Sequence, residues 1–298
     1  MMSKLKAWIK AARPRTVLLS LSGVMMGGFL AASEPAFRLP VAIVATLTAI
    51  LLQILSNLAN DYGDFKKGLD NEDRTGPQRV LQSGALTERQ MRIGILVTIG
   101  LTLISGALLI FVFARLTWQE LAAFAALGSS AVAAALLYTL GKRPYGYRGL
   151  GDLFCFLFFG WVAVAGTYYL TSKTIDFIIL LPATAMGFLS NAVLNINNMR
   201  DYENDKVKGK NTLVVRLGLE YAFVYHTFLV VLPFVCLSVF LLLKGAPWYT
   251  HAFWLLFPLF LRDLTVVHKT METGVPNWLL GKQVIQSFLL VLLFGILL

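Results

Sequence analysis

The sequence is poor in charged residues and in cysteine. Asp, Glu, Lys and Arg make up 14% of the 298 residues, whereas an ordinary soluble domain carries roughly a quarter. This scarcity of charge excludes a water-soluble globular protein. The two cysteines, Cys155 and Cys236, both lie inside apolar stretches, where a free thiol behaves as a small hydrophobic group. They therefore provide neither a disulfide framework nor a redox or metal-binding motif.

Long apolar stretches are what the sequence has instead. Nine segments of 16 to 23 residues contain no Asp, Glu, Lys or Arg: 16–33, 39–60, 93–114, 121–141, 153–172, 177–199, 221–243, 245–261 and 283–298. A helix needs about 20 apolar residues to cross a bilayer, and a membrane barrel would show shorter segments of alternating polarity. Because backbone amides in lipid must be hydrogen-bonded within their own segment, the sequence predicts an all-α, multi-pass membrane bundle of nine transmembrane helices, forming one domain over residues 1–298.

Basic residues are distributed unequally among the loops. The N-terminus and the loops after the second, fourth, sixth and eighth predicted helices contain 22 of the 26 Lys and Arg residues. Because such residues accumulate on the cytoplasmic side, we predict a cytoplasmic N-terminus and a cytoplasmic polar cap, made by loops at about 61–92, 141–152, 200–220 and 262–282. The formal charge of +10 then reflects topology and not nucleic-acid binding.

The first predicted helix follows a basic N-terminus, as in a signal peptide. No small-residue cleavage site precedes a soluble body, so we expect this helix to be retained. Arg13 and Arg15 flank Pro14 at its start. A proline in the first helical turn beside interfacial basic residues accounts for this pattern, and a functional motif is the alternative.

Two of the cap loops are acidic as well as basic, and they share a pattern. At an offset of 141 residues five positions correspond: Asn57 and Asn198, Asn60 and Asp201, Asp64 and Asp205, Lys67 and Lys208, Gly68 and Gly209. If this is an internal repeat, the second and sixth helices are counterparts in two pseudo-symmetric halves with a central cavity between them. A chance match is the alternative.

The spacing of these polar residues indicates a metal and phosphate site. Separations of three, four and seven residues place them on one face of each helix. Asp and Asn oxygens suit a hard cation, and Mg²⁺ prefers one or two carboxylates together with waters and phosphate oxygens. The alternative is that the acidic residues are solvated helix ends. Two matched clusters that each continue an apolar helix favour a site, since polar groups at membrane depth usually face a cavity.

The motifs resemble those of the UbiA superfamily of intramembrane aromatic prenyltransferases, which read N-D-x-x-D-x-x-x-D and D-x-x-x-D. The matching residues are Asn60-Asp61-Tyr62-Gly63-Asp64, Asp201-Tyr202-Glu203-Asn204-Asp205 and, for a further motif, Tyr138-x-x-x-Lys142-Arg143. The first motif departs at its last position, which is Gly68, with Asp70 two residues later. The segments NLANDYGD, DRTGP, RPYGYRGLGD, GTYYL and GKNTLVVRLG most resemble the branch that prenylates 1,4-dihydroxy-2-naphthoate in bacterial menaquinone biosynthesis.

The resemblance implies Mg²⁺-dependent transfer of a polyprenyl group from polyprenyl diphosphate to 1,4-dihydroxy-2-naphthoate, with decarboxylation of the acceptor. It also implies a bacterial inner-membrane location, an active site on the cytoplasmic side and a lateral opening to the lipid bilayer. Within the superfamily, 4-hydroxybenzoate, homogentisate or haem is the alternative acceptor. An ion-coupled transporter is the alternative outside it, although its acidic residues would be expected at the midplane and not at one membrane face.

The candidate residues follow from the chemistry of an allylic diphosphate, whose ionisation is favoured by metal ions and cationic side chains near the bridging oxygen. The predicted metal ligands are Asn60, Asp64, Asp201 and Asp205. The predicted catalytic residues are Asp61, as a further ligand or proton acceptor, Asp64, Asp201, Asp205 and Lys142. The predicted substrate-binding residues are Asn57, Lys67, Arg74, Arg79, Tyr138, Arg143, Tyr145, Asn198, Arg200 and Lys206. Tyrosine ring faces, including Tyr62 and Tyr147, are candidates to shield the allylic cation.

Overall fold

The computed structural model describes residues 3–69 and 76–298 of the chain. In this part of the chain every regular element is helical and no strand occurs. Nine of its helices are long and apolar enough to cross a membrane, so the predicted all-α membrane bundle is confirmed. The candidate residues Asp70 and Arg74 lie outside the described residues.

The nine spans are regular α-helices or α-helices joined to short π- or 3-10-helical pieces. They are α2 (Pro14–Ala32), α3 (Leu39–Lys66), α4 with its π-helical end (Glu88–Phe113), α5 (Trp118–Leu137), α6 to α7 (Gly151–Ser172), α8 with a preceding 3-10 turn (Phe177–Arg200), α11 (Leu219–Leu243), α12 with a preceding 3-10 segment (Trp248–Thr270) and α13 (Asn277–Leu297). Three shorter helices are α1 (Lys4–Ala12), α9 (Tyr202–Val207) and α10 (Leu213–Leu217).

The last two spans are longer than the predicted apolar segments. Because α12 ends at Thr270 and α13 begins at Asn277, the loop expected at 262–282 is reduced to residues 271–276. A paired charge explains the difference. Asp263 on α12 is 2% exposed and accepts hydrogen bonds from Lys282 and Gln286 on α13. The sequence interpretation ended a span at each charged residue, whereas a charge with a partner can lie inside a bundle.

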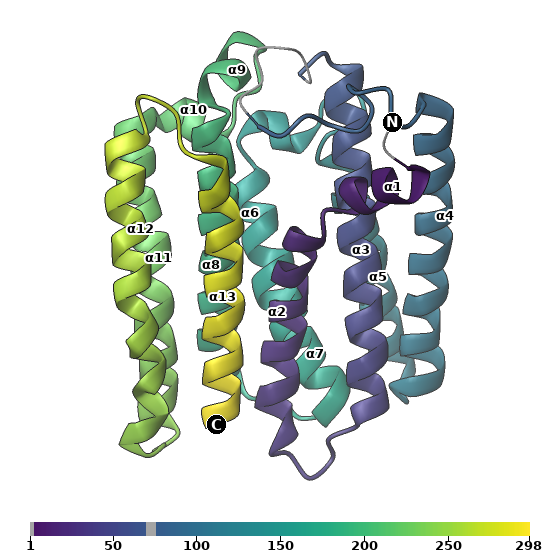
Figure 1. Ribbon diagram of the computed structural model, residues 1–298. Helices are drawn as coiled ribbons and strands as arrows, with labels where there is room; N and C mark the ends of the chain where they lie inside the picture. Colours follow the sequence, from purple (N-terminus) through teal and green to yellow (C-terminus); the bar gives the residue numbers. More distant parts are fainter. Residues whose placement is uncertain (1–2, 70–75) are drawn as a thin grey trace.

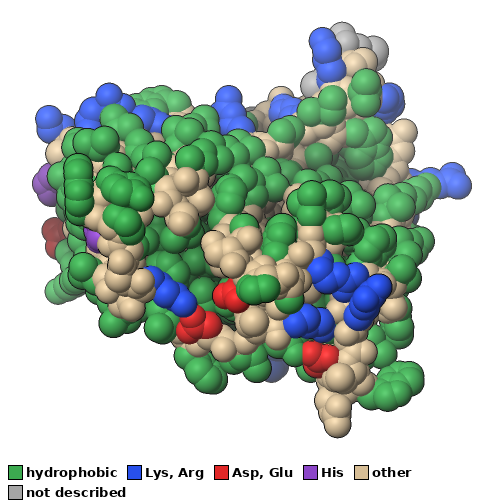
Figure 2. Space-filling model, turned by 90° about the horizontal axis from the view of Figure 1, so that it is seen from below, with side chains coloured by type: hydrophobic (Ala, Val, Ile, Leu, Met, Phe, Trp, Pro, Cys, Tyr) green, Lys and Arg blue, Asp and Glu red, His purple; other side chains and the backbone are tan. Residues whose placement is uncertain are grey.

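The two ends of the bundle differ in structure and polarity. Figure 1 shows α9, α10 and the connection from α3 to α4 at the upper end, with the C-terminus at the lower end. Figure 2 views the lower end, where hydrophobic side chains cover most of the face and charged side chains form separate spots. The polar cap therefore lies at one end of the bundle.

Close helix contacts set the shape of the interior. The most enclosed span contains α8, with 61% of its apolar window buried, whereas α5 is peripheral, with 6% buried. A Cβ on Gly27 of α2 would lie 2.4 Å from the Val164 carbonyl oxygen of α7, and one on Gly160 would lie 2.6 Å from the Ala183 carbonyl oxygen of α8. Glycine at these positions lets the backbones of neighbouring helices touch, which fixes the walls around a central cavity.

Candidate active site

A cavity of about 530 Å³ is enclosed by α2, α3, α4, α5, α8 and the Gly151–Ser172 span. Apolar side chains line most of it. Its polar wall comes from the ends of α3 and α8 and from α9, and consists mainly of Asn57, Asn60, Asp64, Asn197, Asp201, Asn204 and Asp205. The two acidic motifs, which the sequence places 141 residues apart, therefore face one cavity.

The two motifs end in the same backbone turn. Gly68 and Gly209 have φ values of 68° and 71°, in the left-handed region. The next residue donates its backbone N–H to the Asp64 carbonyl at 3.0 Å in the first motif and to the Asp205 carbonyl at 2.8 Å in the second. Glycine is favoured in such turns because it has no Cβ. The two motifs thus share this turn, and Gly68 follows the end of a helix where the superfamily motif has an aspartate.

On α3, Asn60 and Asp64 line the cavity one turn apart. One carboxylate oxygen of Asp64 accepts a hydrogen bond from the Tyr147 hydroxyl at 2.8 Å, and the other lies 3.6 Å from the Arg79 guanidinium. The Oδ1 atom of Asn60 is buried and accepts no hydrogen bond from the described residues. A buried acceptor at a cavity wall fits coordination of a cation or a donor from a ligand.

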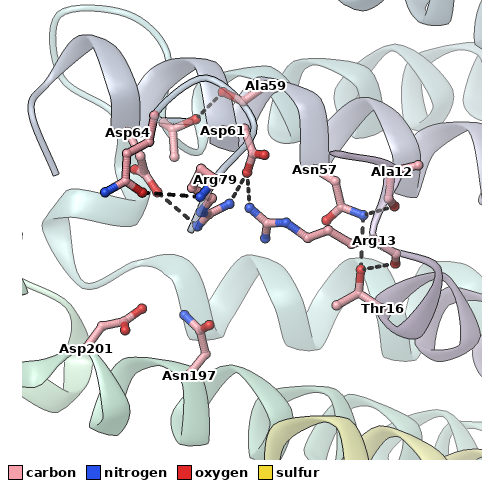
Figure 3. A network of polar contacts seen from close by, with 12 residues as sticks. Ala12, Arg13, Thr16, Asn57, Ala59, Asp61, Asp64, Arg79, Asn197 and Asp201 are labelled. Atoms are coloured by element: carbon pink, nitrogen blue, oxygen red, sulfur yellow. Dashed lines mark hydrogen bonds and ion pairs between the residues drawn. The ribbon is translucent and has the colours of Figure 1, made fainter. Parts of the chain in front are cut away.

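Asn57, a predicted substrate-binding residue, holds the corner between α1 and α2. Its amide nitrogen donates to the Ala12 carbonyl at 2.8 Å and to the Thr16 hydroxyl at 3.0 Å. Its Oδ1 accepts a hydrogen bond from Gln53 at 3.1 Å. Arg13 occupies the corner itself, with a φ of 51°. Figure 3 shows Asn57 bonded to this corner while the Arg13 side chain extends along α3. Asn57 therefore lines the cavity and also fixes the direction of Arg13.

Asp61 lies between two arginines that are distant in the sequence (Figure 3). Its Oδ1 accepts hydrogen bonds from both Arg13 and Arg79, and its side chain is 3% exposed. Both arginines line the cavity, whereas Asp61 does not. This geometry favours a role in positioning two cations at the cavity wall over the predicted role as a metal ligand or proton acceptor.

The second motif forms the facing wall, and Figure 3 shows Asp201 and Asn197 across from the α3 network. Asp201 accepts hydrogen bonds from Arg200 at 2.8 Å and 2.7 Å, and Asp205 lies 3.7 Å from the Lys210 ammonium. Lys210 lines the cavity, whereas Arg200 does not. The facing wall thus offers two buried carboxylates and one buried ammonium group.

The oxygen donors of the two walls fit Mg²⁺ shared with a phosphate ligand. In the described ranges, no group of three or more Asp, Glu, His and Cys side chains is close enough to hold an ion by itself. Mg²⁺ commonly takes one or two carboxylates and completes its octahedron with waters and substrate phosphates. Carboxylates on two facing walls, with amide oxygens beside them, match that kind of site better than a cage made of protein alone.

Tyr138 and Tyr145 both line the cavity, as predicted for an aromatic wall. Their rings meet edge to face at 5.4 Å, and the Tyr145 hydroxyl donates to the Ala134 carbonyl at 2.9 Å. Burial raises the pKa of both hydroxyls, and the nearby charge of Asp64 raises the pKa of Tyr138 further. Both rings therefore stay neutral. Tyr62 instead packs into an apolar cluster beside α1 and α4.

Besides Asp61, six residues of the predicted catalytic and substrate-binding sets do not line this cavity: Lys67, Lys142, Arg143, Asn198, Arg200 and Lys206. Lys67, Lys142 and Arg143 line a separate cleft of about 370 Å³ on the cap. Asn198 is buried inside the bundle, and Lys206 is exposed. The Lys and Arg residues among these six lie close to the motifs in sequence. The direction of the chain at the helix ends turns their side chains away from the cavity.

The polar residues of the cavity wall that the sequence interpretation did not assign to the site include Arg13, Asn197 and Asn204. Asn197 and Asn204 lie four residues before and three after Asp201, so helical spacing alone could have identified them. Arg13 was considered only as part of a doubtful motif at the start of the first helix. Its partner is 48 residues away, and no local pattern indicates the contact.

Residues 20–276 match the UbiA prenyltransferase family. The chain belongs to this family. Its relatives include the 1,4-dihydroxy-2-naphthoate octaprenyltransferase of Haemophilus influenzae, which is 41% identical over 98% of this chain and 96% of the relative. The protein of the same name from Escherichia coli is 42% identical over 98% of this chain and 94% of the relative. A UbiA homolog from Archaeoglobus fulgidus, solved with GPP and Mg²⁺, has the same fold, with a TM-score of 0.66 and 17% identity over 99% of both chains.

Membership in the UbiA prenyltransferase family confirms three predictions. The chain is a member of the UbiA family, as the resemblance predicted, it is an aromatic prenyltransferase, and it is a multi-pass membrane protein. The alternative of an ion-coupled transporter is therefore set aside.

Proposed function

We propose that this UbiA prenyltransferase transfers a polyprenyl group from polyprenyl diphosphate to 1,4-dihydroxy-2-naphthoate, with loss of CO₂ from the acceptor, to give demethylmenaquinone. The observation that supports this most directly is the shared cavity, which has carboxylates and amides at one end and apolar walls elsewhere. A polyprenyl diphosphate has the same division into a charged head and a hydrocarbon tail. The two relatives named above, 41% and 42% identical, support the choice of acceptor.

Asn60, Asp64, Asp201 and Asp205 are the proposed Mg²⁺ ligands. Bound Mg²⁺ would neutralise the charge that develops on the leaving diphosphate as the allylic C–O bond breaks. The Archaeoglobus fulgidus homolog was solved with GPP and Mg²⁺ bound, which supports this use of the cavity. The buried Oδ1 atom of Asn60, which accepts no hydrogen bond from the described part of the chain, gives independent support.

Three cationic side chains line the cavity near these ligands: Arg13, Arg79 and Lys210. The proposed role of all three is to contact the diphosphate oxygens. Asp61 holds the two arginines, and Asp205 lies beside the lysine. Because these groups are held in place before the substrate arrives, little reorganisation is needed when charge moves onto the leaving group.

The neutral side chains of Tyr138 and Tyr145 line the cavity, and the Tyr145 ring stacks on Phe154 at 4.3 Å. We assign them to the reacting end of the prenyl chain, where aromatic faces can shield an allylic cation from water. The electron-rich acceptor ring must approach within about 3 to 3.5 Å of the cation for the new C–C bond to form.

The apolar part of the cavity is proposed to hold the polyprenyl tail. Leu103 and Phe111 at the end of α4 and Leu127 of α5 line it, and their side chains are 53%, 64% and 38% exposed. Exposed residues in a cavity wall indicate an opening at the surface between these helices, which faces lipid in a membrane-spanning bundle. A long tail can then extend into the bilayer, where hydrocarbon is most stable.

The cytoplasmic orientation and the bacterial inner membrane remain part of the proposal. The end that bears α9, α10 and the α3–α4 connection is also the end at which the basic loops gather. The excess of Lys and Arg in short loops supports a cytoplasmic location for that end, the N-terminus and the active site.

The proposal is tested with purified protein, radiolabelled polyprenyl diphosphate and a panel of acceptors. We expect product with 1,4-dihydroxy-2-naphthoate and none with 4-hydroxybenzoate or homogentisate. Asp64→Asn and Asp201→Asn should each lower kcat by roughly 10²- to 10³-fold, the usual cost of removing one preorganised electrostatic group. Asp263→Asn is the matched control, since this buried carboxylate does not line the cavity. Product with another acceptor alone, or full activity of Asp64→Asn, would refute the proposal.

A further inference from the structure

A second cleft lies on the polar cap beside the active-site cavity and is called here the basic cleft. It has a volume of about 370 Å³ and is lined by Lys67, Lys142, Arg143, Pro144, Tyr147 and Arg148. Among the described residues, no carboxylate lines it. Within residues 3–69 and 76–298, none of its four cationic side chains forms an ion pair. The basic cleft therefore has four positive charges that no ion pair with a described residue compensates.

The loop that presents these cations is held firmly. The backbone N–H of Gly146 donates to the Tyr138 carbonyl at 3.1 Å, and a Cβ at Gly146 would lie 2.7 Å from the same oxygen. The Tyr147 carbonyl accepts from the N–H of Asn211 at 3.2 Å, and the Arg148 carbonyl accepts from the Arg216 guanidinium at 2.7 Å. Two segments distant in sequence thus fix the wall of the basic cleft.

Tyr147 lines the basic cleft and also contacts a residue of the cavity wall. Its hydroxyl donates to Asp64, on the cavity side. The ammonium of Lys67, in the cleft, lies 4.2 Å from the centre of its ring, and the ammonium of Lys210, in the cavity wall, lies 5.4 Å from it. One ring thus contacts both a cation of the cavity wall and a cation of the cleft. Burial lowers the pKa of Lys67, the charge of Asp64 raises it, and the charge of Lys210 lowers it; a bound anion would raise it, as Asp64 does.

We propose that the basic cleft binds inorganic diphosphate and is the route by which this product leaves the enzyme. When the allylic C–O bond breaks, both of its electrons stay on the diphosphate oxygen, and the product is a small polyanion one side chain away from the cleft. Four cations and no carboxylate suit such an anion, whose oxygens can each accept charge-assisted hydrogen bonds. The proposal rests on the prenyl-transfer function of the cavity.

The test measures equilibrium binding of radiolabelled pyrophosphate to the full-length chain, in zwitterionic detergent without added lipid and with EDTA. Without divalent ions the carboxylates of Asp64, Asp201 and Asp205 repel diphosphate from the cavity, which leaves the basic cleft as the binding site. We expect saturable binding that weakens at least tenfold in Arg143→Gln and in Arg148→Gln. Arg262→Gln, a control at a cation whose side chain is 63% exposed on α12, should bind as the unchanged protein does.

Kinetics provide the second arm of the test. If diphosphate leaves through the basic cleft, Arg148→Gln should lower the steady-state rate more than the single-turnover rate and weaken product inhibition by pyrophosphate. Pyrophosphate binding in EDTA that is absent, or equal in all variants, would overturn the proposal. The proposal would also be overturned if Arg143→Gln and Arg148→Gln raise the KM for the naphthoate but leave pyrophosphate binding intact. A further contrary result would be a basic cleft that binds phosphatidylglycerol in nanodiscs and does not bind pyrophosphate. Because binding is measured without acceptor, a failed acceptor panel would overturn only the proposed function.

Discussion

The arrangement of Asp61 between two arginines makes a prediction that separates positioning from metal binding. Asp61→Asn keeps the shape of the side chain and one acceptor oxygen, but it removes the negative charge that holds Arg13 and Arg79 at the cavity wall. Both arginines line the cavity, and Asp61 itself does not. The substitution should therefore weaken capture of the diphosphate and leave Mg²⁺ binding unaffected.

The size of the effect follows from the contacts. Asp61 is 3% exposed on its side chain and accepts a hydrogen bond from each arginine. Hydrogen bonds to charged groups contribute about 1.5–3 kcal/mol. If one such contact is lost in the transition state, kcat/KM for polyprenyl diphosphate should fall roughly 10- to 100-fold. The assay is initial-rate prenyl transfer at varied polyprenyl diphosphate and at varied Mg²⁺.

The Mg²⁺ titration decides the outcome, and Asp64→Asn is the comparison. Asp64 lines the cavity, so its substitution should raise the Mg²⁺ concentration that gives half of the maximal rate. Asp61→Asn should leave that concentration unchanged. A tenfold rise for Asp61→Asn would show that Asp61 is a metal ligand and that the positioning role is wrong. Thermal unfolding in detergent, measured for both variants, shows whether each is folded.

Two further predictions concern the fold. Gly160→Ala should destabilise the protein by about 1–3 kcal/mol, because its Cβ would lie 2.6 Å from the Ala183 carbonyl oxygen. Gly128→Ala is the control and should leave the stability unchanged, because no atom lies within 4 Å of the added carbon. Equal unfolding temperatures for the Gly160→Ala and Gly128→Ala variants would contradict the argument. Lys244 donates a hydrogen bond to Asp176, which lowers the pKa of that carboxyl group. The pair therefore stabilises the fold at pH values above the usual pKa of aspartate, and this stabilisation is lost as the pH falls through the lowered pKa of Asp176. Because the pair is partly exposed, Lys244→Gln should lower the free energy of unfolding by at most about 1 kcal/mol near neutral pH and leave it unchanged at low pH. Thermal unfolding measured at both pH values checks this.

Much of the fold could be predicted from local composition. The nine spans appear in the sequence as uncharged segments because a helix in lipid needs a continuous apolar surface. The motif residues of α3 and α8 were found because helical periodicity brings residues three, four and seven apart onto one face. The ends of α12 and α13 were misplaced because the pairing of Asp263 with Lys282 depends on how the two helices pack, and a single charged residue does not reveal its partner.

The sequence by itself determined the transmembrane spans, the polarity of the two ends and the two matched acidic motifs, because each of these depends on residues close together in the chain. Only the tertiary structure decided which polar groups share the cavity. It brought Arg13 and Arg79 onto Asp61, and it placed Lys142 and Arg143 in the basic cleft. These contacts depend on the corner before α2 and on the turn of the cap loop, where a small change of backbone angle redirects a long side chain by many ångströms.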